Sequence, residues 1–106
     1  MAKLHVVRGR DAFSALSRHG RRARHGPLTV VHLAGTDDTR VAFAVSRRVG
    51  GAVVRNRLRR RLRAHWAQLA PPPGDYLILT TPAAATTGFV ALGDHLRSAL
   101  ARLEAS

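Results

Sequence analysis

The sequence predicts an α+β fold, a small two-layer sandwich in which helices cover one sheet. Three segments, 27–34, 40–46 and 75–81, are β-branched, alternating or apolar in the manner of strands. Two others, 52–69 and 87–103, carry apolar residues at helical spacing on one side only. Because a helix with one apolar stripe must bury it against another element, we expect these helices to pack on the sheet.

A short helix is predicted in the segment GRDAFSALSRHG, residues 9–20. Asp11 can accept hydrogen bonds from the free N–H groups at its start, and Gly20 is a natural stop. Phe13 and Leu16 give the helix an apolar edge. A basic stretch, RRARHG, follows the helix and precedes the first predicted strand.

The strands 27–34 and 40–46 flank the turn-forming sequence GTDDT. In the second strand, Val41, Phe43 and Val45 alternate with small residues, which is the period of a half-buried strand. Since only a turn separates the two strands, we expect them to pair as a hairpin.

Three prolines and a glycine, residues 71–74, end the long helix and precede the third strand. That strand, DYLILTT, is apolar almost throughout, which favours a central position in the sheet. Thr87 is suited to cap the last helix, although Gly93 interrupts it. The apolar stripe of this helix consists of Leu92, Leu96, Leu100 and Leu103.

The chain has 106 residues and no cysteine, and both facts limit its class. Its length suits one domain, residues 1–106, with one small core. The lack of cysteine excludes disulfides, thiolate metal sites and cysteine nucleophiles. No apolar run approaches the roughly 20 residues that span a bilayer, and the N-terminus lacks a secretory signal. We therefore expect a cytoplasmic protein.

The net charge of +12 comes from 18 basic residues against six acidic ones. Such a field attracts polyanions, which are nucleic acids or anionic membrane surfaces. Lys3 is the only lysine, and the planar guanidinium of arginine suits phosphate oxygens and stacks on bases. A GC-rich genome also favours arginine over lysine, but base composition does not explain why the arginines cluster.

Six of the nine residues from Arg55 to Arg63 are arginine, and no carboxylate lies within ten residues of this cluster. If residues 52–69 are helical at about 100° per residue, the apolar stripe occupies an arc of about 120°. That stripe consists of Val54, Leu58, Leu62, Trp66 and Leu69. Opposite it lie Arg57, Arg60 and Arg63 with Asn56, while Arg59 and Arg61 flank it.

This concentration of charge is costly for an isolated helix. Like charges three or four residues apart destabilise a helix by about 0.2–0.5 kcal/mol per pair, and positive charge is unfavourable at a helix N-terminus. A merely solvated face usually mixes both signs, whereas a bound polyanion would remove the repulsion. A membrane is the rival partner. The apolar stripe is needed for the domain's own sheet, so we favour a nucleic acid and expect no membrane contact.

The stretch RVAFAVSRRVGGAVVRNRLRRRLRAHW, with GDYLILTTPAA after it, resembles the bacterial ribonuclease P protein component. The similar residues are the strand end Ser46-Arg47-Arg48, the turn Gly50-Gly51-Ala52-Val53, and Arg55-Asn56-Arg57 with Arg60 and Arg63. The segment DAFSALSRHG also resembles the family's opening helix, so the resemblance spans residues from about 8 to 103.

The resemblance implies a mixed sheet of about four strands with a left-handed βαβ crossover, against the usual right-handed rule. This is the ribonuclease P protein or ribosomal S5 domain 2-like fold, and its extra strand would lie in RRARH. The implied role is that of a non-catalytic subunit of ribonuclease P, which binds the catalytic RNA and the 5′ leader of precursor tRNA. The RNA would perform the Mg²⁺-dependent hydrolysis that removes the leader. The protein itself would bind no cofactor and no small-molecule substrate.

By resemblance, part of the arginine cluster contacts the RNA subunit, and neighbouring arginines extend the predicted contact. The full set is Arg55, Asn56, Arg57, Arg60 and Arg63, with Arg47, Arg48, Arg59 and Arg61. Two alternatives remain open. Asn56 could be a helix-start amide that bonds the backbone, and Arg47 and Arg48 could simply be an exposed strand end.

Phe13 matches one of the aromatics with which the family lines a leader-binding cleft between the first helix and the sheet. Packing in the core is the alternative role for Phe13. Ser17 and Val31 stand where further aromatics are expected. The sequence therefore predicts leader binding that is weaker or more electrostatic in this chain.

The sequence offers no catalytic set of its own. Its six carboxylates are scattered, and only Asp37 and Asp38 are neighbours, whereas two-metal hydrolysis needs several that converge. His65 falls on the apolar side of the arginine helix, where a structural role is expected, and the other histidines show no ligand spacing. Two other classes share the size and charge: a ribosomal or RNA-chaperone protein, and a nuclease that acts without an RNA subunit.

Overall fold

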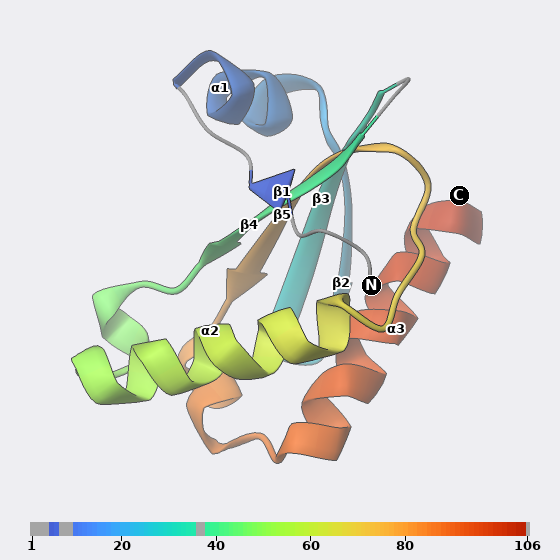
Figure 1. Ribbon diagram of the computed structural model, residues 1–106. Coiled ribbons are helices and arrows are strands. Elements are labelled where there is room, and N and C mark those ends of the chain that lie inside the picture. Colours follow the sequence, from blue (N-terminus) through green and yellow to red (C-terminus); the bar gives the residue numbers. More distant parts are fainter. Residues whose placement is uncertain (1–4, 7–9, 36–37, 106) are drawn as a thin grey trace.

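A computed structural model describes residues 5–6, 10–35 and 38–105, which form a mixed sheet in the order β1-β4-β5-β3-β2 (Figure 1). The strands are β1 (His5–Val6), β2 (Arg21–His25), β3 (Leu28–Ala34), β4 (Thr39–Ala44) and β5 (Gly74–Thr80). The helices are α1 (Arg10–His19), α2 (Ala52–Trp66) and α3 (Phe89–Ala105), with the 3-10 turns η1 (Arg47–Val49) and η2 (Pro82–Thr86). The predicted α+β class with a mixed sheet is confirmed.

Side chains of the central strands alternate between two cores, one on each face of the sheet. Val30 and Ile78 belong to the main core under α2 and α3. Val31 belongs to a smaller core under Leu16 of α1, with Leu77 packed against it. The sandwich of sheet and helices therefore carries α1 as a partial further layer on its other face (Figure 1).

The predicted hairpin between residues 27–34 and 40–46 is wrong, because β5 lies between β3 and β4. It runs antiparallel to β3 and parallel to β4. β5 takes this central place because it is apolar toward both faces of the sheet, as its sequence indicated. The partner of β3 in a hairpin is β2, across a turn at Gly26 with φ +59°. The strand suspected in RRARH is thus present.

The parallel strands β4 and β5 are joined by a crossover that contains η1 and α2. In Figure 1 the chain descends β4, returns through α2 in front of the sheet and enters β5 to the right of β4. The crossover is therefore left-handed, as the resemblance implied and against the usual rule. It places one side of α2 on the sheet and leaves the other side to solvent.

The helix ends differ from the expected ones in detail. α1 begins at Arg10, so Asp11 lies in the first turn, where its negative charge interacts favourably with the positive end of the helix dipole. α2 ends at Trp66, about one turn earlier than the apolar stripe suggested. Thr87 does not cap α3, because its hydroxyl donates to the carbonyl of Ala83 at 2.9 Å. Among the described helices, none is long and apolar enough to cross a membrane.

Gly93 allows α2 and α3 to approach closely. It is buried, and a β-carbon at this position would overlap the ring of His65 on α2. That ring is held in place, because its Nε2 donates to the carbonyl of Phe89 at 2.7 Å and the ring stacks on the Phe89 side chain. His65 is therefore structural, as expected, and the interruption of the last helix by glycine has a packing reason.

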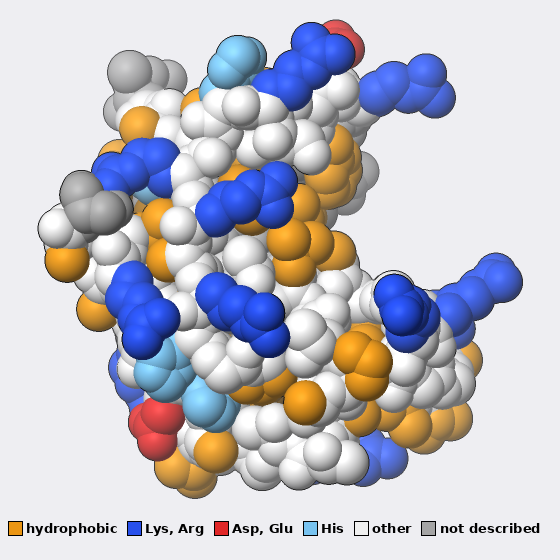
Figure 2. Space-filling view, turned by 180° about the vertical axis from the view of Figure 1, so that it is seen from behind, with side chains coloured by type: hydrophobic (Ala, Val, Ile, Leu, Met, Phe, Trp, Pro, Cys, Tyr) orange, Lys and Arg blue, Asp and Glu red, His pale blue; other side chains and the backbone are white. Residues whose placement is uncertain are grey.

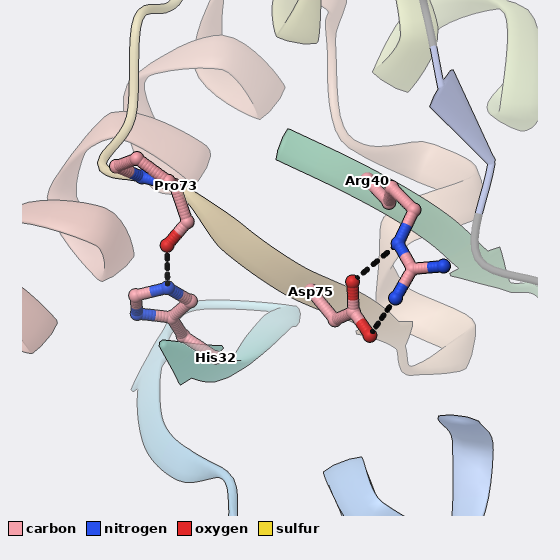
Figure 3. A network of polar contacts seen from close by, with 4 residues as sticks. All are labelled: His32, Arg40, Pro73 and Asp75. Atoms are coloured by element: carbon pink, nitrogen blue, oxygen red, sulfur yellow. Dashed lines mark hydrogen bonds and ion pairs between the residues drawn. The ribbon is translucent and has the colours of Figure 1, made fainter. Parts of the chain in front are cut away.

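Polar contacts join the starts of β4 and β5 and tie the last part of β3 to the proline run (Figure 3). Arg40 on β4 donates from Nε and Nη2 to the carboxylate of Asp75 on β5, at 2.7 and 2.8 Å. His32 on β3 donates from Nε2 to the carbonyl of Pro73 at 3.1 Å and stacks on Tyr76. These contacts hold the chain after the proline run against the sheet.

Candidate RNA-binding surface

The sheet buries one side of α2 and exposes the other. Leu58, Leu62 and Trp66 are buried in the main core. The opposite side, here called the α2 arginine face, consists of Asn56, Arg57, Arg60 and Arg63, and all four are exposed. The spacing of apolar residues and arginines along the sequence predicted both the buried side and the exposed side of this helix.

The charge of the α2 arginine face is not neutralised within the described residues. The ion pairs described there join Arg40 to Asp75 and Arg97 to Asp94, and none involves an arginine of α2 or η1. The first turn of α2 also contains no acidic residue, so the positive end of the helix dipole adds to the field. This surface is therefore electrostatically suited to a polyanion.

Arg59 and Asn56 form a contact at the edge of this face. Arg59 donates from Nη1 to the Asn56 side-chain oxygen at 3.3 Å and from Nη2 to the Val45 carbonyl at 3.4 Å. The residue that caps α2 is Gly51, not Asn56. Within the described residues, the hydrogen bond of the Asn56 side chain is this one with Arg59 and none joins it to the backbone, contrary to the helix-start alternative.

Arg55 and Arg61 are half-buried, as is Arg59. Arg61 lies beside η2, in a crevice that Val54 and Ala84 also line. The Arg55 Nε is buried without a hydrogen-bond partner in the described structure. Half-burial of these side chains fits the usual arrangement for arginine beside a core, in which the aliphatic stem covers apolar surface.

Arg47 and Arg48 are exposed, but they do not lie on a strand. β4 ends at Ala44, and the two arginines form the 3-10 turn η1, which is anchored by the buried side chain of Val49. η1 comes immediately before the N-terminus of α2. The two arginines therefore extend the basic surface at the positive end of that helix.

The other face of the sheet carries α1 and Phe13. Leu16 is completely buried against the sheet, whereas Phe13 is 39% exposed and is therefore not a plain core residue. Ser17, four residues after Phe13 on the same side of the helix, is also exposed, and Val31 is buried beneath α1. In Figure 2 this face is hollowed between α1 above and the start of α2 below, with hydrophobic side chains in the hollow.

Two histidines that are 70 residues apart in the sequence meet between β2 and α3. The Nδ1 atoms of His25 and His95 are 2.9 Å apart, so one nitrogen donates to the other. Their spacing in the sequence gave no signal of this pair. Within the described residues, no three histidine, aspartate or glutamate side chains gather in a way that could hold a metal ion.

A family model described as Ribonuclease P matches residues 1–104 of this chain. The chain belongs to the ribonuclease P protein family. Ribonuclease P protein components from Streptomyces avermitilis and Clavibacter michiganensis are 40% and 39% identical to it. In both comparisons the match covers 92% of this chain and 89% of the relative. Membership of the family assigns the chain to RNA binding and tRNA processing.

Solved structures of the family have the same fold. The RNase P protein of Staphylococcus aureus matches with a TM-score of 0.85 at 18% identity, over 95% of this chain and 96% of that one. The protein of Thermotoga maritima matches with a TM-score of 0.81 at 23% identity, over 92% of this chain and 96% of that one. The fold implied by the resemblance is therefore confirmed for this family member.

Proposed function

We propose that this chain is the protein subunit of ribonuclease P and binds the catalytic RNA through the α2 arginine face. The observation that carries the proposal is the row of Arg57, Arg60 and Arg63, exposed along α2 and without a carboxylate partner in the described residues. A folded RNA presents phosphates that can neutralise such a row and release counterions as it binds. The repulsion within the row is then offset by the partner.

The neighbouring residues fit the same contact. Arg47 and Arg48 continue the basic surface beyond the N-terminus of α2, and the half-buried Arg55, Arg59 and Arg61 raise the local potential from the flanks. Asn56 adds directed hydrogen bonds rather than charge, so it would fix the register of the RNA on the helix.

The second RNA contact that we propose is with the 5′ leader of precursor tRNA, on the face that carries α1. The exposed part of Phe13 on α1 offers a flat aromatic surface for one unpaired base, and α1 borders the hollow seen in Figure 2. The leader and the RNA subunit would then occupy different sides of the protein.

We assign the hydrolysis of the phosphodiester bond, and the Mg²⁺ that it requires, to the RNA subunit. In this scheme the role of the protein is to hold both RNAs. It orients them and supplies no reacting group. The protein would bind no cofactor or small molecule of its own, and its work would be in the cytoplasm, with precursor tRNA.

A reconstitution tests the proposal. The purified protein is added to precursor tRNA with and without a bacterial ribonuclease P RNA, at a Mg²⁺ concentration too low for the RNA alone. We expect cleavage at the mature 5′ end only when both are present. Cleavage by the protein alone would indicate an independent nuclease. Binding without any increase in cleavage would indicate a general RNA chaperone or a ribosomal protein.

A further inference from the structure

The basic stretch in β2 has no role in the function proposed above. β2 is an edge strand of the sheet, and its side chains alternate between the two faces. Ala23 packs against the main core, and Arg21 and His25 reach α3 through Leu103 and His95. The strand therefore directs its other two arginines, Arg22 and Arg24, to the face that carries α1.

The strand register shows what lies beside these two arginines. Arg24 on β2 pairs with Thr29 on β3. Thr29 in turn pairs with Leu79 on β5, and Leu79 pairs with Ala44 on β4. All three of these neighbours are half-buried, so the row is partly open to solvent. The next row starts at Arg22 and passes through Val31, Leu77 and Ala42 beneath α1, of which Val31 and Ala42 are buried and Leu77 is half-buried. One partly open row thus crosses the sheet from β2 to β4.

This row has a floor of small and apolar side chains and a basic group at each end. Arg22 and Arg24 stand at the β2 end, and Arg47 and Arg48 follow shortly after the β4 end. β2 and β4 are three strand spacings apart, which is about 14 Å, a span of a few nucleotides. Figure 2 shows arginine side chains beside the hydrophobic hollow on this face.

The two β2 arginines are also exposed and free of carboxylates. In the described part of the chain, the Arg22 side chain makes no hydrogen bond or ion pair, and the Arg24 side chain makes only a 3.4 Å bond to the carbonyl of Gly26, while the Arg24 carbonyl accepts a bond from Arg102 on α3. A single-stranded nucleic acid with unpaired bases suits this arrangement, because bases can lie on an apolar floor while guanidinium groups hold the phosphates. A duplex would keep its bases stacked inside and would not use the floor.

We infer that Arg22 and Arg24 bind phosphates of the 5′ leader where it leaves the sheet, and that they partly replace the aromatic contacts which this chain lacks at Ser17 and Val31. This inference rests on the proposed function, because it needs the leader to cross the α1 face. The leader would contact α1 near the cleavage site and reach β2 only with its more distant nucleotides. A leader of one nucleotide would therefore not reach Arg22 or Arg24.

The experiment measures binding of precursor tRNA to the reconstituted holoenzyme, with a leader of about ten nucleotides or of one nucleotide. The test variant is Arg22→Gln with Arg24→Gln. The control variant is Arg97→Gln, which removes an exposed arginine from α3 on the opposite layer. We expect the test variant to bind the long-leader substrate about five-fold more weakly at low salt, with a salt slope reduced by about 1.4, as two single-strand contacts require. Its affinity for the one-nucleotide leader and for the RNA subunit should match the wild type.

The other outcomes separate this inference from the proposed function. If the wild type prefers the long leader, and the test variant binds the long-leader substrate as tightly as the wild type does, the inference is overturned while the proposed function stands. An equal loss for both leaders, or weaker binding of the RNA subunit, would also overturn it, because the two arginines would then contact another RNA. A wild-type protein that neither binds the RNA subunit nor distinguishes the two leaders would instead refute the proposed function.

Discussion

The Asp75 carboxylate on β5 accepts two hydrogen bonds from the guanidinium of Arg40 on the neighbouring parallel strand, at 2.7 and 2.8 Å. The Asp75 side chain is 12% exposed, so its charge is largely removed from water, while Arg40 remains 45% exposed. The pair joins the two strands that the long crossover separates in sequence, at the end where β5 begins. It therefore stabilises a contact between two segments that are 35 residues apart in the sequence.

Replacement of Asp75 by Asn should lower the free energy of unfolding by about 1–2 kcal/mol, because the amide keeps the shape but loses the charge-assisted pair. Urea unfolding at pH 7 measures the change. The Arg40→Met variant and the double variant complete a cycle, and a coupling energy near zero would contradict a stabilising role for this ion pair.

Replacement of Gly93 by Ala should destabilise the protein by about 1–3 kcal/mol, because the new methyl group overlaps the ring of His65. The same change made together with His65→Ala should be neutral or stabilising by up to about 1 kcal/mol, since alanine is the better helix former. Thermal unfolding of the four proteins checks this reversal of sign. A Gly93→Ala change that costs the same in both backgrounds would mean that the ring is not the obstacle.

The helices of this fold could be predicted from sequence because their signal is local. The spacing of Leu58, Leu62 and Trp66 alone located the buried side of α2, and the structure agrees. The order of the strands could not be predicted in this way. The turn after β3 suggested a hairpin with β4, but the energy gained by inserting the doubly apolar β5 between them depends on contacts distant in sequence.

The candidate site was predictable to a similar degree. Exposure of the arginines opposite the stripe follows from helical geometry, and the structure shows it. The contact of Asn56 with Arg59, the 3-10 turn under Arg47, and the direction of Arg24 depend on how segments meet. The sequence RRARH shows that alternate residues of β2 face opposite sides of the sheet. Which side Arg22 and Arg24 take could not be predicted without knowing which face α3 covers.

The double variant Arg57→Ala with Arg60→Ala should weaken binding of the RNA subunit and reduce the salt slope by about two phosphate contacts, or 1.4–1.8 in log–log units. Both side chains are exposed, so the fold should be unaffected. Binding titrations between low and moderate salt measure the slope. Arg97→Ala is the control, and an unchanged slope in the double variant would exclude this helix face from the RNA contact.

Replacement of Phe13 by Ala should weaken binding of leader-bearing substrate by about 1–3 kcal/mol, if one base stacks on the ring. Because Phe13 is 39% exposed, its loss should affect stability less than the loss of a core phenylalanine. The affinities of holoenzymes for substrates with and without a leader measure this effect, and Phe13→Trp should preserve binding. A loss of stability with unchanged discrimination between the two substrates would instead support the core-packing alternative.

Tyr76 should make the protein lose stability at alkaline pH. Burial raises its pKa from 10.0 to about 12, and the negative charge of Glu104 adds to this effect. Between about pH 10 and 12 the unfolded chain therefore releases a proton that the folded protein keeps. The stabilisation is complete below pH 10 and is lost, at up to about 1.4 kcal/mol per pH unit, as the pH rises toward 12.

The Tyr76→Phe variant isolates this effect. At pH 8 it should be less stable than the wild type by about 1 kcal/mol, because the Tyr76 hydroxyl no longer donates to the Pro72 carbonyl, a bond of 2.6 Å. As the pH rises from 10 to 12, only the wild type carries the penalty for tyrosine ionisation, so the difference should shrink and then reverse. Since Tyr76 is the only tyrosine, its ionisation can be followed directly by absorbance. A folded protein in which this tyrosine ionises near pH 10 would contradict the prediction.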